Sequence, residues 1–322
     1  QFHPSIGILM ETEVWPNLVH GCRRRGIPLV LANARFNAQS LRKAQRLGWL
    51  ARPAYASLAA VWAQTEGDAQ RLRAIGAPVQ AVLGNLKFDL VPDASQVAQG
   101  QAWRAASTRP VVMLASSREG EEALWLEKIK QKTVQPLDLH TSIAIKNVVP
   151  DAAPPTGIGV QWLIVPRHPQ RFAEVQQLLQ AAGLRVSRRS TWAQHPPQDT
   201  DVWLGDSLGE MPLYYGLADV ALLGGSFAPL GGQNLIEAAA CGCPVVLGPH
   251  TFNFAEAADN ACEAGAAQRV PDMAQGIAAA CSLACNAPHL AQAQARARQF
   301  AQSHQGAAQA TATAVAQHLD PH

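Results

Sequence analysis

Acidic side chains follow the first apolar run of this sequence, at a place where they could act on a ligand. Glu11 and Glu13 come directly after the apolar run 6–10. If the chain stays extended past that run, both carboxylates project from one face, because strand side chains repeat every two residues. Two such carboxylates can transfer a proton or stabilise a positive charge. We therefore predict a site here that uses Glu11 or Glu13; ordinary solvent exposure of both is the alternative.

Basic side chains follow two further apolar runs. Lys87 lies in the segment GNLKFD (84–89), where its ammonium group could neutralise a phosphate or a carboxylate; an ordinary surface lysine is the alternative. Arg167 and His168 stand between two prolines directly after an apolar run. That setting is poor for packing and good for binding a phosphate or a base edge. The segment GDSLGEM (205–211) follows another run in the same way.

The acidic stretch 119–122 has a structural explanation. Ser117 could cap a helix, and the acidic residues that follow would complement the dipole of that helix. The free amides of such a helix start would also suit an anion. The helix cap explains most of these residues.

The stretch GGSFAPLGGQNLIEAAACGCPVVLGPHTFNF (224–254) combines two glycine pairs with a single carboxylate. The glycines permit a positive φ and a close approach of the backbone to a ligand. A helix is predicted from Gln233, and its unpaired amides and dipole favour a phosphate. Glu237 suits a ribose diol, because its carboxylate only accepts hydrogen bonds. Gly242 is the predicted C-cap of this helix.

These residues stand at the ends of regularly spaced elements. Short apolar runs alternate with alanine-rich amphipathic stretches, which is the pattern of a parallel sheet covered by helices. In such sheets ligands gather at the carboxyl ends of the strands. The predicted strands cover residues 6–10, 28–33, 60–63, 79–83, 111–115, 162–165, 201–204, 220–223 and 244–247. The predicted helices cover residues 17–25, 40–51, 68–75, 119–131, 170–182, 211–218 and the alanine- and glutamine-rich end from 290.

The length of 322 residues and the hydrophobic content of 48% predict two globular domains. Residues 90–109 are polar and lack a strong apolar period, so we place the junction there. The predicted domains are a partial N-terminal domain over 1–105 and a C-terminal domain over 106–322. Residues 133–159 hold several prolines, which predicts an inserted surface loop.

Composition excludes several classes of function. The formal net charge of +2 does not support a nucleic-acid partner. The six cysteines lack zinc-binding spacing, so we expect no structural metal site. We also expect no metal in the reaction and no cofactor. No run of about 18 apolar residues is present to span a membrane. The chain begins at Gln1 and enters a strand almost at once, so we expect its beginning, with any anchor there, to be missing.

Five motifs together resemble bacterial 3-deoxy-D-manno-octulosonic acid (Kdo) transferases. They are METEVWPN (10–17), GNLKFD (84–89), VPRHPQRF (165–172), GDSLGEM (205–211) and the stretch 224–254, in the family's order over nearly the whole chain. The resemblance implies transfer of Kdo from CMP-Kdo to a lipid A precursor, lipid IVA, in lipopolysaccharide core biosynthesis, by metal-independent inverting glycosyl transfer. It also implies the α/β GT-B fold, with two Rossmann-like domains facing across a cleft and the first domain incomplete.

The same resemblance implies roles for individual residues. Glu11 and Lys87 correspond to the family's transition-state-stabilising pair, and Glu11 is preferred to Glu13 because it begins the motif. The implied CMP contacts are Arg167, His168, Leu208, Gly209, Glu210, Asn234, Leu235, Ile236 and Glu237. The resemblance also includes His250 and Asn253, to which spacing gives no role.

This chain departs from the family in its expected N-terminal features. The family's general base is a glutamate in an N-terminal segment, beside a membrane-associating stretch, and neither is present in these residues. We therefore expect donor binding without efficient transfer, by a protein that meets the cytoplasmic face of the inner membrane through the missing segment. Arg118 stands where the family usually has a histidine. The alternatives are another GT-B transferase with a UDP- or ADP-linked sugar, and a non-catalytic nucleotide-binding module.

Overall fold

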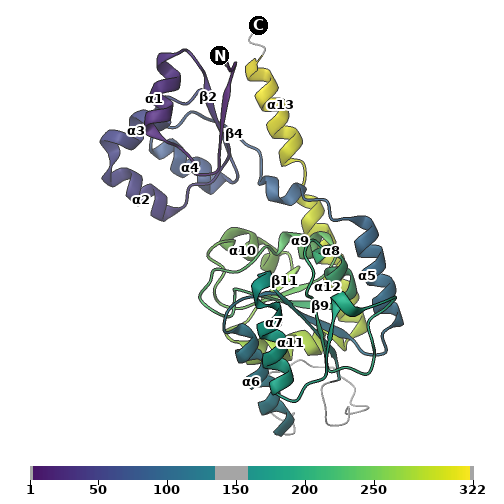
Figure 1. Cartoon of the computed structure of the whole chain (residues 1–322). Helices are drawn as coiled ribbons and strands as arrows, with labels where there is room; N and C mark the ends of the chain where they lie inside the picture. The colour runs from purple at the N-terminus through teal and green to yellow at the C-terminus, as the bar shows by residue number, and fades with distance from the viewer. Residues whose placement is uncertain (1–2, 135–158, 320–322) are drawn as a thin grey trace. The chain divides into compact units, whose positions relative to one another are not determined.

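The computed structural model describes residues 3–134 and 159–319, apart from the side chains of residues 131–134. The chain forms two compact α/β units. Unit 1 consists of Gln1–Leu90 together with Gln302–His322, and unit 2 consists of Val91–Ala301. Each unit contains one parallel sheet flanked by helices (Figure 1).

The sheet of unit 1 has four parallel strands in the order β1-β2-β3-β4. They are β1 (Gly7–Met10), β2 (Leu29–Ala34), β3 (Ala60–Ala63) and β4 (Val79–Val82). The connecting helices are α1 (Pro16–Arg24), α2 (Ala38–Arg46), α3 (Gly48–Ala56) and α4 (Glu66–Ala74). Strands β2 and β3 are buried along their whole length, which is why they appear in the sequence as continuous apolar runs.

The helix α13 (Ala307–Leu319) covers one face of that sheet. The ring of His318 meets the ring of Trp62 on β3 edge to face, with 5.5 Å between the centroids. The start of the helix is fixed by Asp89, whose carboxylate accepts hydrogen bonds from the N–H groups of Gly306 and Ala308. A carboxylate at this position satisfies amides that the first turn leaves unpaired. The end of the chain therefore folds as part of unit 1.

The sheet of unit 2 has seven parallel strands in the order β11-β10-β9-β5-β6-β8-β7. They are β5 (Val111–Ser117), β6 (Gln161–Pro166), β7 (Val186–Arg188), β8 (Val202–Leu204), β9 (Val220–Leu223), β10 (Val245–Leu247) and β11 (Ala267–Arg269). The chain moves outward from β5 first in one direction and then in the other, so the topological switch lies between β5 and β9. In open sheets of this kind, ligands bind at the carboxyl ends of the strands beside the switch.

Helices cover the sheet of unit 2. They are α5 (Ala94–Ala106), α6 (Glu121–Val134), α7 (Phe172–Ala181), α8 (Met211–Leu217), α9 (Ile236–Ala240), α10 (Ala255–Glu263), α11 (Met273–Ala284) and α12 (Ala287–Ser303). Side chains of α6, α7 and α11 form the main core together with those of β5, β6, β8 and β9. At its centre Trp125 and Trp162 are fully buried and meet edge to face, 5.2 Å between centroids.

The predicted domain boundary differs from the division of the structure. Residues 90–109 hold the helix α5, which packs against α8 within unit 2. Gly100 makes this contact so close that a Cβ atom there would lie 2.2 Å from a backbone oxygen of α8. A helix that packs through glycine and alanine shows little apolar period in its sequence. The division therefore falls after Leu90 rather than at 105/106, and residues 302–322 join unit 1.

The nine predicted strands are confirmed, with bounds shifted by no more than two residues. The strands β7 and β11 lie outside the predicted set, because each is a short, partly exposed edge strand with polar residues. The prediction of one helix over 40–51 is wrong, since the chain divides at Leu47 into α2 and α3. The helix predicted from 290 is likewise two helices, separated at Gly306. The loop predicted over 133–159 falls almost entirely outside the described residues.

Within residues 3–134 and 159–319, every helix is too short or too polar to cross a bilayer.

Candidate functional site

Two of the predicted site residues meet in unit 1. Glu11 directly follows β1, and Lys87 lies in the 3-10 helix η1 (Leu86–Asp89) that follows β4. The Lys87 Nζ atom is 3.2 Å from Glu11 Oε1. Both side chains remain more than a third exposed, at 41% and 37% respectively. A cation and a carboxylate from the two outer strands are thus paired at the carboxyl end of the sheet and stay accessible to a ligand.

Glu11 and Glu13 do not share a face, and that prediction is wrong. The backbone turns at Glu11, which has a left-handed φ of 54°, and the Glu13 N–H closes the turn by donating to Met10 O at 3.0 Å. The side chain of Glu13 instead accepts a hydrogen bond from Trp15 Nε1 at 2.9 Å. The two carboxylates therefore have different partners: Glu11 pairs with Lys87, and Glu13 with the indole of Trp15.

Asn33 supports the Glu11 and Lys87 pair from the middle of the sheet. It lies near the end of β2, is 5% exposed, and has a left-handed φ of 51°. Its side-chain oxygen accepts a hydrogen bond from Leu86 N at 3.2 Å, and so holds the turn that carries Lys87. Left-handed backbone at residues other than glycine is strained and concentrates at functional sites. The sequence signal for Asn33, which our prediction overlooked, is one amide inside an otherwise apolar strand.

The carboxyl ends of β5 and β9 meet at the switch point of unit 2. Ser116, at the end of β5, has a left-handed φ of 53°. A Cβ atom on Gly224, which follows β9, would lie 2.3 Å from Ser116 O. The glycine at this position is therefore required by the close approach of the two chain segments. The close approach at Gly224 is between two segments of the protein, whereas the predicted approach of the backbone to a ligand stays a prediction.

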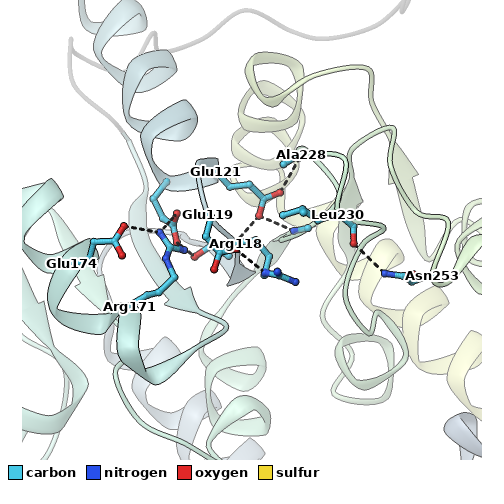
Figure 2. Close-up of polar contacts among 11 residues, drawn as sticks. Arg118, Glu119, Glu121, Arg171, Glu174, Ala228, Leu230 and Asn253 are labelled. Carbon is cyan, nitrogen blue, oxygen red and sulfur yellow. Dashed lines mark hydrogen bonds and ion pairs between the residues drawn. The ribbon is translucent and has the colours of Figure 1, made fainter.

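A buried carboxylate holds the glycine-rich loop that follows β9. Glu121, in the first turn of α6, is 0% exposed and accepts hydrogen bonds from the N–H groups of Gly225 (2.7 Å), Phe227 (3.1 Å) and Ala228 (3.2 Å). A fourth bond comes from Arg118 N at 2.9 Å. Figure 2 shows Glu121 between the turn at Arg118 and the loop at Ala228. The assignment of this acidic stretch to the helix dipole alone is therefore incomplete.

The neighbouring Glu122 holds a different loop. Its carboxylate is also 0% exposed and binds both terminal nitrogens of Arg171, at 2.8 and 3.0 Å. Ser117 donates its hydroxyl to the same carboxylate at 2.6 Å, so it belongs to β5 and to this network and is not the predicted helix cap. Arg171 ends the short 3-10 helix η2 (Pro169–Arg171), directly after the predicted site residues Arg167 and His168. The network thereby fixes the loop after β6.

Arg167 and Glu237 lie close enough to influence each other. Burial raises the pKa of the Glu237 carboxyl group, and the Arg167 guanidinium acts in the opposite direction. Arg167 is exposed, and its backbone N–H donates to the Ser117 backbone oxygen at 3.0 Å. His168 is half-buried and immediately precedes η2. The structure thus brings a cation after β6 near a carboxylate of α9, as a phosphate and ribose site would require.

The loop after β8 presents a mixture of exposed and engaged groups. Leu208 is exposed, and Gly209 has a left-handed φ of 76°. The Glu210 carboxylate is already paired, because Arg189 Nη2 donates to Glu210 Oε1 at 2.8 Å. This pairing orients Glu210 and reduces its freedom to bind a ligand directly.

The predicted helix of the glycine-rich stretch begins later than expected, at Ile236 rather than Gln233. The side-chain oxygen of Asn234 accepts a hydrogen bond from Ile236 N at 3.0 Å, so it satisfies one of the first amides. Leu235 and Ile236 are 1% and 0% exposed as whole residues, so they are packed inside the protein at the start of α9. Gly242 follows the helix with a φ of 76°, which confirms its predicted capping position.

His250 and Asn253, to which spacing gives no role, hold the glycine-rich loop through hydrogen bonds. His250 N donates to Ser226 O at 3.0 Å, and Asn253 N donates to Gly231 O at 3.0 Å. The Asn253 side chain also donates to Leu230 O at 3.1 Å (Figure 2). These contacts are structural, and they order the loop before α9.

No group of three or more histidine, cysteine, aspartate or glutamate side chains arranged to hold a metal ion occurs among the residues that the structure describes. The six cysteines of the chain are free thiols.

Comparison with known proteins gives a consistent set of similarities. The family model described as 3-deoxy-D-manno-octulosonic-acid transferase (kdotransferase) matches residues 1–90. The 3-deoxy-D-manno-octulosonic acid transferase of Bordetella pertussis is 46% identical over 97% of this chain and 69% of its own length. The enzyme of the same name from Haemophilus influenzae is 34% identical over 79% of this chain and 55% of its own length. The chain thus spans between about half and two thirds of these relatives.

Solved structures of other proteins also resemble the chain. The C-terminal CMP-Kdo binding domain of WaaA from Acinetobacter baumannii is 30% identical, with a TM-score of 0.51, over 65% of this chain and 97% of that domain. Anabaena Alr3699/HepE in complex with UDP has a TM-score of 0.56 over 96% of this chain and 78% of its own. At 13% identity, that second likeness shows the fold alone. The α/β fold predicted from the sequence, with parallel sheets of the GT-B type, is confirmed.

Proposed function

Because this chain belongs to the 3-deoxy-D-manno-octulosonic acid transferase family, we propose that it takes Kdo from CMP-Kdo and transfers it to a lipid A precursor, lipid IVA, in lipopolysaccharide core biosynthesis. The family makes it a glycosyltransferase. The observation that supports the donor is the 30% identity of 65% of this chain to a CMP-Kdo binding domain that is matched over 97% of its length.

The donor site that we propose lies at the carboxyl ends of the unit 2 strands. Arg167 supplies a permanent cation for the phosphate, and Glu237 accepts hydrogen bonds from the ribose hydroxyls. The remaining proposed CMP contacts are His168, Leu208, Gly209, Glu210, Asn234, Leu235 and Ile236. Leu208 contributes an exposed side chain, whereas Leu235 and Ile236 are buried and contribute by fixing the start of α9. Glu210 acts in the orientation that Arg189 gives it.

The transfer step that we propose is inverting and needs no metal ion. A base removes the proton of the acceptor hydroxyl, that oxygen attacks the anomeric carbon of Kdo, and the bond from that carbon to the CMP phosphate oxygen breaks. Arg167 stabilises the charge that develops on the leaving CMP. Lys87 offsets the negative charge of the Kdo carboxylate or of the phosphate, and Glu11 orients the Lys87 ammonium group across 3.2 Å. By family resemblance the base is a glutamate of an N-terminal segment.

The donor assignment predicts a ranking of nucleotides. In calorimetric titration, CMP is expected to bind at least about tenfold more tightly than UMP or ADP, a difference of roughly 1.4 kcal/mol. An equal or tighter affinity for UMP or ADP would favour a transferase that uses a different nucleotide sugar.

The dependence of nucleoside affinity on pH tests the proposed contact between Glu237 and the ribose. Since burial raises the pKa of Glu237, this group takes up a proton at a higher pH than an ordinary glutamate. A protonated carboxyl group is a poorer acceptor for the ribose hydroxyls, so the affinity for cytidine should fall as the pH drops through that raised pKa. Cytidine is used because it has no phosphate to titrate. The Glu237→Gln variant should lose this pH dependence, and its persistence would remove Glu237 from the ribose contact.

We also propose that unit 1 binds the cytoplasmic face of the inner membrane, where the lipid acceptor resides. Residues 14–65 contain eight arginine and lysine residues and no aspartate or glutamate. Large apolar side chains are exposed in this stretch, including Trp15 at 60% before α1, Leu47 at 54% between α2 and α3, and Trp49 at 78% on α3. Basic charge combined with exposed tryptophan is typical of surfaces that bind anionic lipid headgroups.

Vesicle binding tests this membrane surface. The Trp49→Ser variant is expected to bind vesicles containing anionic phospholipid roughly tenfold more weakly, because the indole no longer leaves water on binding. The matched control is Val91→Ser, which removes another exposed apolar side chain, 83% accessible, outside helices α1 to α3. Equal binding by the Trp49→Ser variant and the unmodified chain would contradict the proposal.

A further inference from the structure

Glu121 is a fully buried carboxylate that the sequence pattern assigns only to a helix dipole. Three of its four hydrogen bonds come from the loop after β9, more than a hundred residues later in the chain. Figure 2 shows the side chain directed away from its own helix and into that loop. Among the ion pairs of the described residues, none involves Glu121. Its charge is therefore balanced by backbone N–H groups.

The loop amides form an anion-binding nest around this carboxylate. Successive N–H groups that point to one centre, with a glycine in the left-handed region, are the usual backbone device for binding a phosphate. Gly225 has a φ of 70°, and the N–H groups of Gly225, Phe227 and Ala228 all donate to Glu121. The nest is thus filled by the protein's own anion. A nucleotide phosphate cannot use the same N–H groups while Glu121 occupies them.

Burial and hydrogen bonding act on Glu121 in opposite directions. Burial raises the pKa of the Glu121 carboxyl group, and the four backbone N–H groups act to lower it. A buried carboxylate is costly unless its oxygens are fully hydrogen-bonded, so the carboxylate and the loop stabilise each other only in this conformation. Removing either partner leaves unpaired buried groups.

The held loop leads directly into the proposed donor site. Gly232 N donates to Gly225 O at 2.8 Å, so fixing the start of the loop also fixes its end. Asn234 follows two residues later, and Glu237 lies in the first turn of α9. By holding this short loop in place, Glu121 therefore also fixes the residues that we propose contact the nucleotide.

We propose that Glu121 is a positioning residue of the donor site, which fills the nest of the glycine-rich loop and holds residues 225–237 in the nucleotide-binding conformation. This inference rests on the proposed donor site of unit 2. It also implies that the nucleotide phosphate depends on Arg167 and not on the amides of residues 225–228.

The test compares two buried carboxylates at opposite ends of the same strands. Glu121→Gln keeps the side-chain size but places an NH₂ group against backbone N–H donors. The control Asp219→Asn changes a carboxylate at the amino ends of β5 and β9, which accepts from Val111 N at 2.7 Å and Arg104 Nε at 2.6 Å. Both variants are expected to lower the unfolding temperature. Only Glu121→Gln should raise the Kd for CMP, by about tenfold or more.

Amide hydrogen exchange provides a second readout that needs no nucleotide. Residues 224–237 are expected to exchange faster in Glu121→Gln than in the unmodified chain, and at an unchanged rate in Asp219→Asn. Equal losses of CMP affinity in both variants, or unchanged affinity and exchange in a folded Glu121→Gln variant, would overturn the proposal. If the unmodified chain binds UMP or ADP instead, that nucleotide replaces CMP. If it binds none, the proposed donor fails, whereas the exchange result alone still decides whether Glu121 positions the loop.

Discussion

Replacing Lys87 with alanine is expected to lower kcat/KM for Kdo transfer by about 10²- to 10³-fold, the usual loss when one charge-stabilising donor is removed. The ammonium group lies 3.2 Å from Glu11 and remains 41% exposed, so it is oriented and still accessible to a substrate. An exposed pair of this kind contributes little to folding. The affinity for CMP, which carries no Kdo, should change little.

Two further variants test whether the loss comes from the Glu11 and Lys87 pair or from removing any lysine. Glu11→Gln should also lower kcat/KM with CMP affinity retained, because it removes the charge that orients Lys87. Lys128→Ala removes another lysine with a glutamate partner, at 2.8 Å from Glu127, and should leave transfer unchanged. Unchanged turnover in Lys87→Ala would exclude the proposed role. CMP binding by the unmodified protein without any Kdo transfer would favour a nucleotide-binding module.

The sequence predicts the sheets well because both are parallel and their central strands are buried on both faces. Strands such as β5 and β9 must then be continuous apolar runs, and the residues after them mark the edge where ligands bind. This rule brings Glu11 and Lys87 to one edge of unit 1 although they are far apart in the chain. It does not identify which carboxylate meets the lysine. That depends on the left-handed turn at Glu11, for which the side chains give no signal.

The residues that organise the site are harder to predict. Glu121 and Glu122 fit the pattern of an acidic first helical turn, and that pattern is satisfied equally by solvent-exposed side chains. Their actual partners are a loop after β9 and Arg171 after β6, which only the folded sheet brings to the start of α6. Local sequence therefore predicts where a ligand binds, whereas the supporting contacts depend on the strand order.

Replacing Arg171 with methionine is expected to lower the free energy of unfolding of unit 2 by about 3–5 kcal/mol, the usual cost of leaving one buried charge without its partner. Glu122 and Arg171 have side chains that are 1% and 7% exposed, joined by two hydrogen bonds. Without the guanidinium, the Glu122 carboxylate keeps only the Ser117 hydroxyl as its hydrogen-bond donor among the contacts described above. The measurement is urea unfolding of the whole chain, followed through the transition of unit 2.

A second arginine variant shows whether the loss of stability comes from the burial of the ion pair or from losing any ion pair. Arg185→Met breaks an arginine and aspartate pair that is largely exposed, with Arg185 66% accessible, so it should change stability little. The double variant Arg171→Met with Glu122→Met replaces both buried charges with apolar groups and should recover most of the loss. Similar losses in Arg171→Met and Arg185→Met would contradict the role of burial. The Glu122 and Arg171 pair also fixes the loop that carries Arg167. Even a stable double variant should therefore bind CMP more weakly than the unmodified chain. That result would show that the pair positions the loop as well as stabilising the fold.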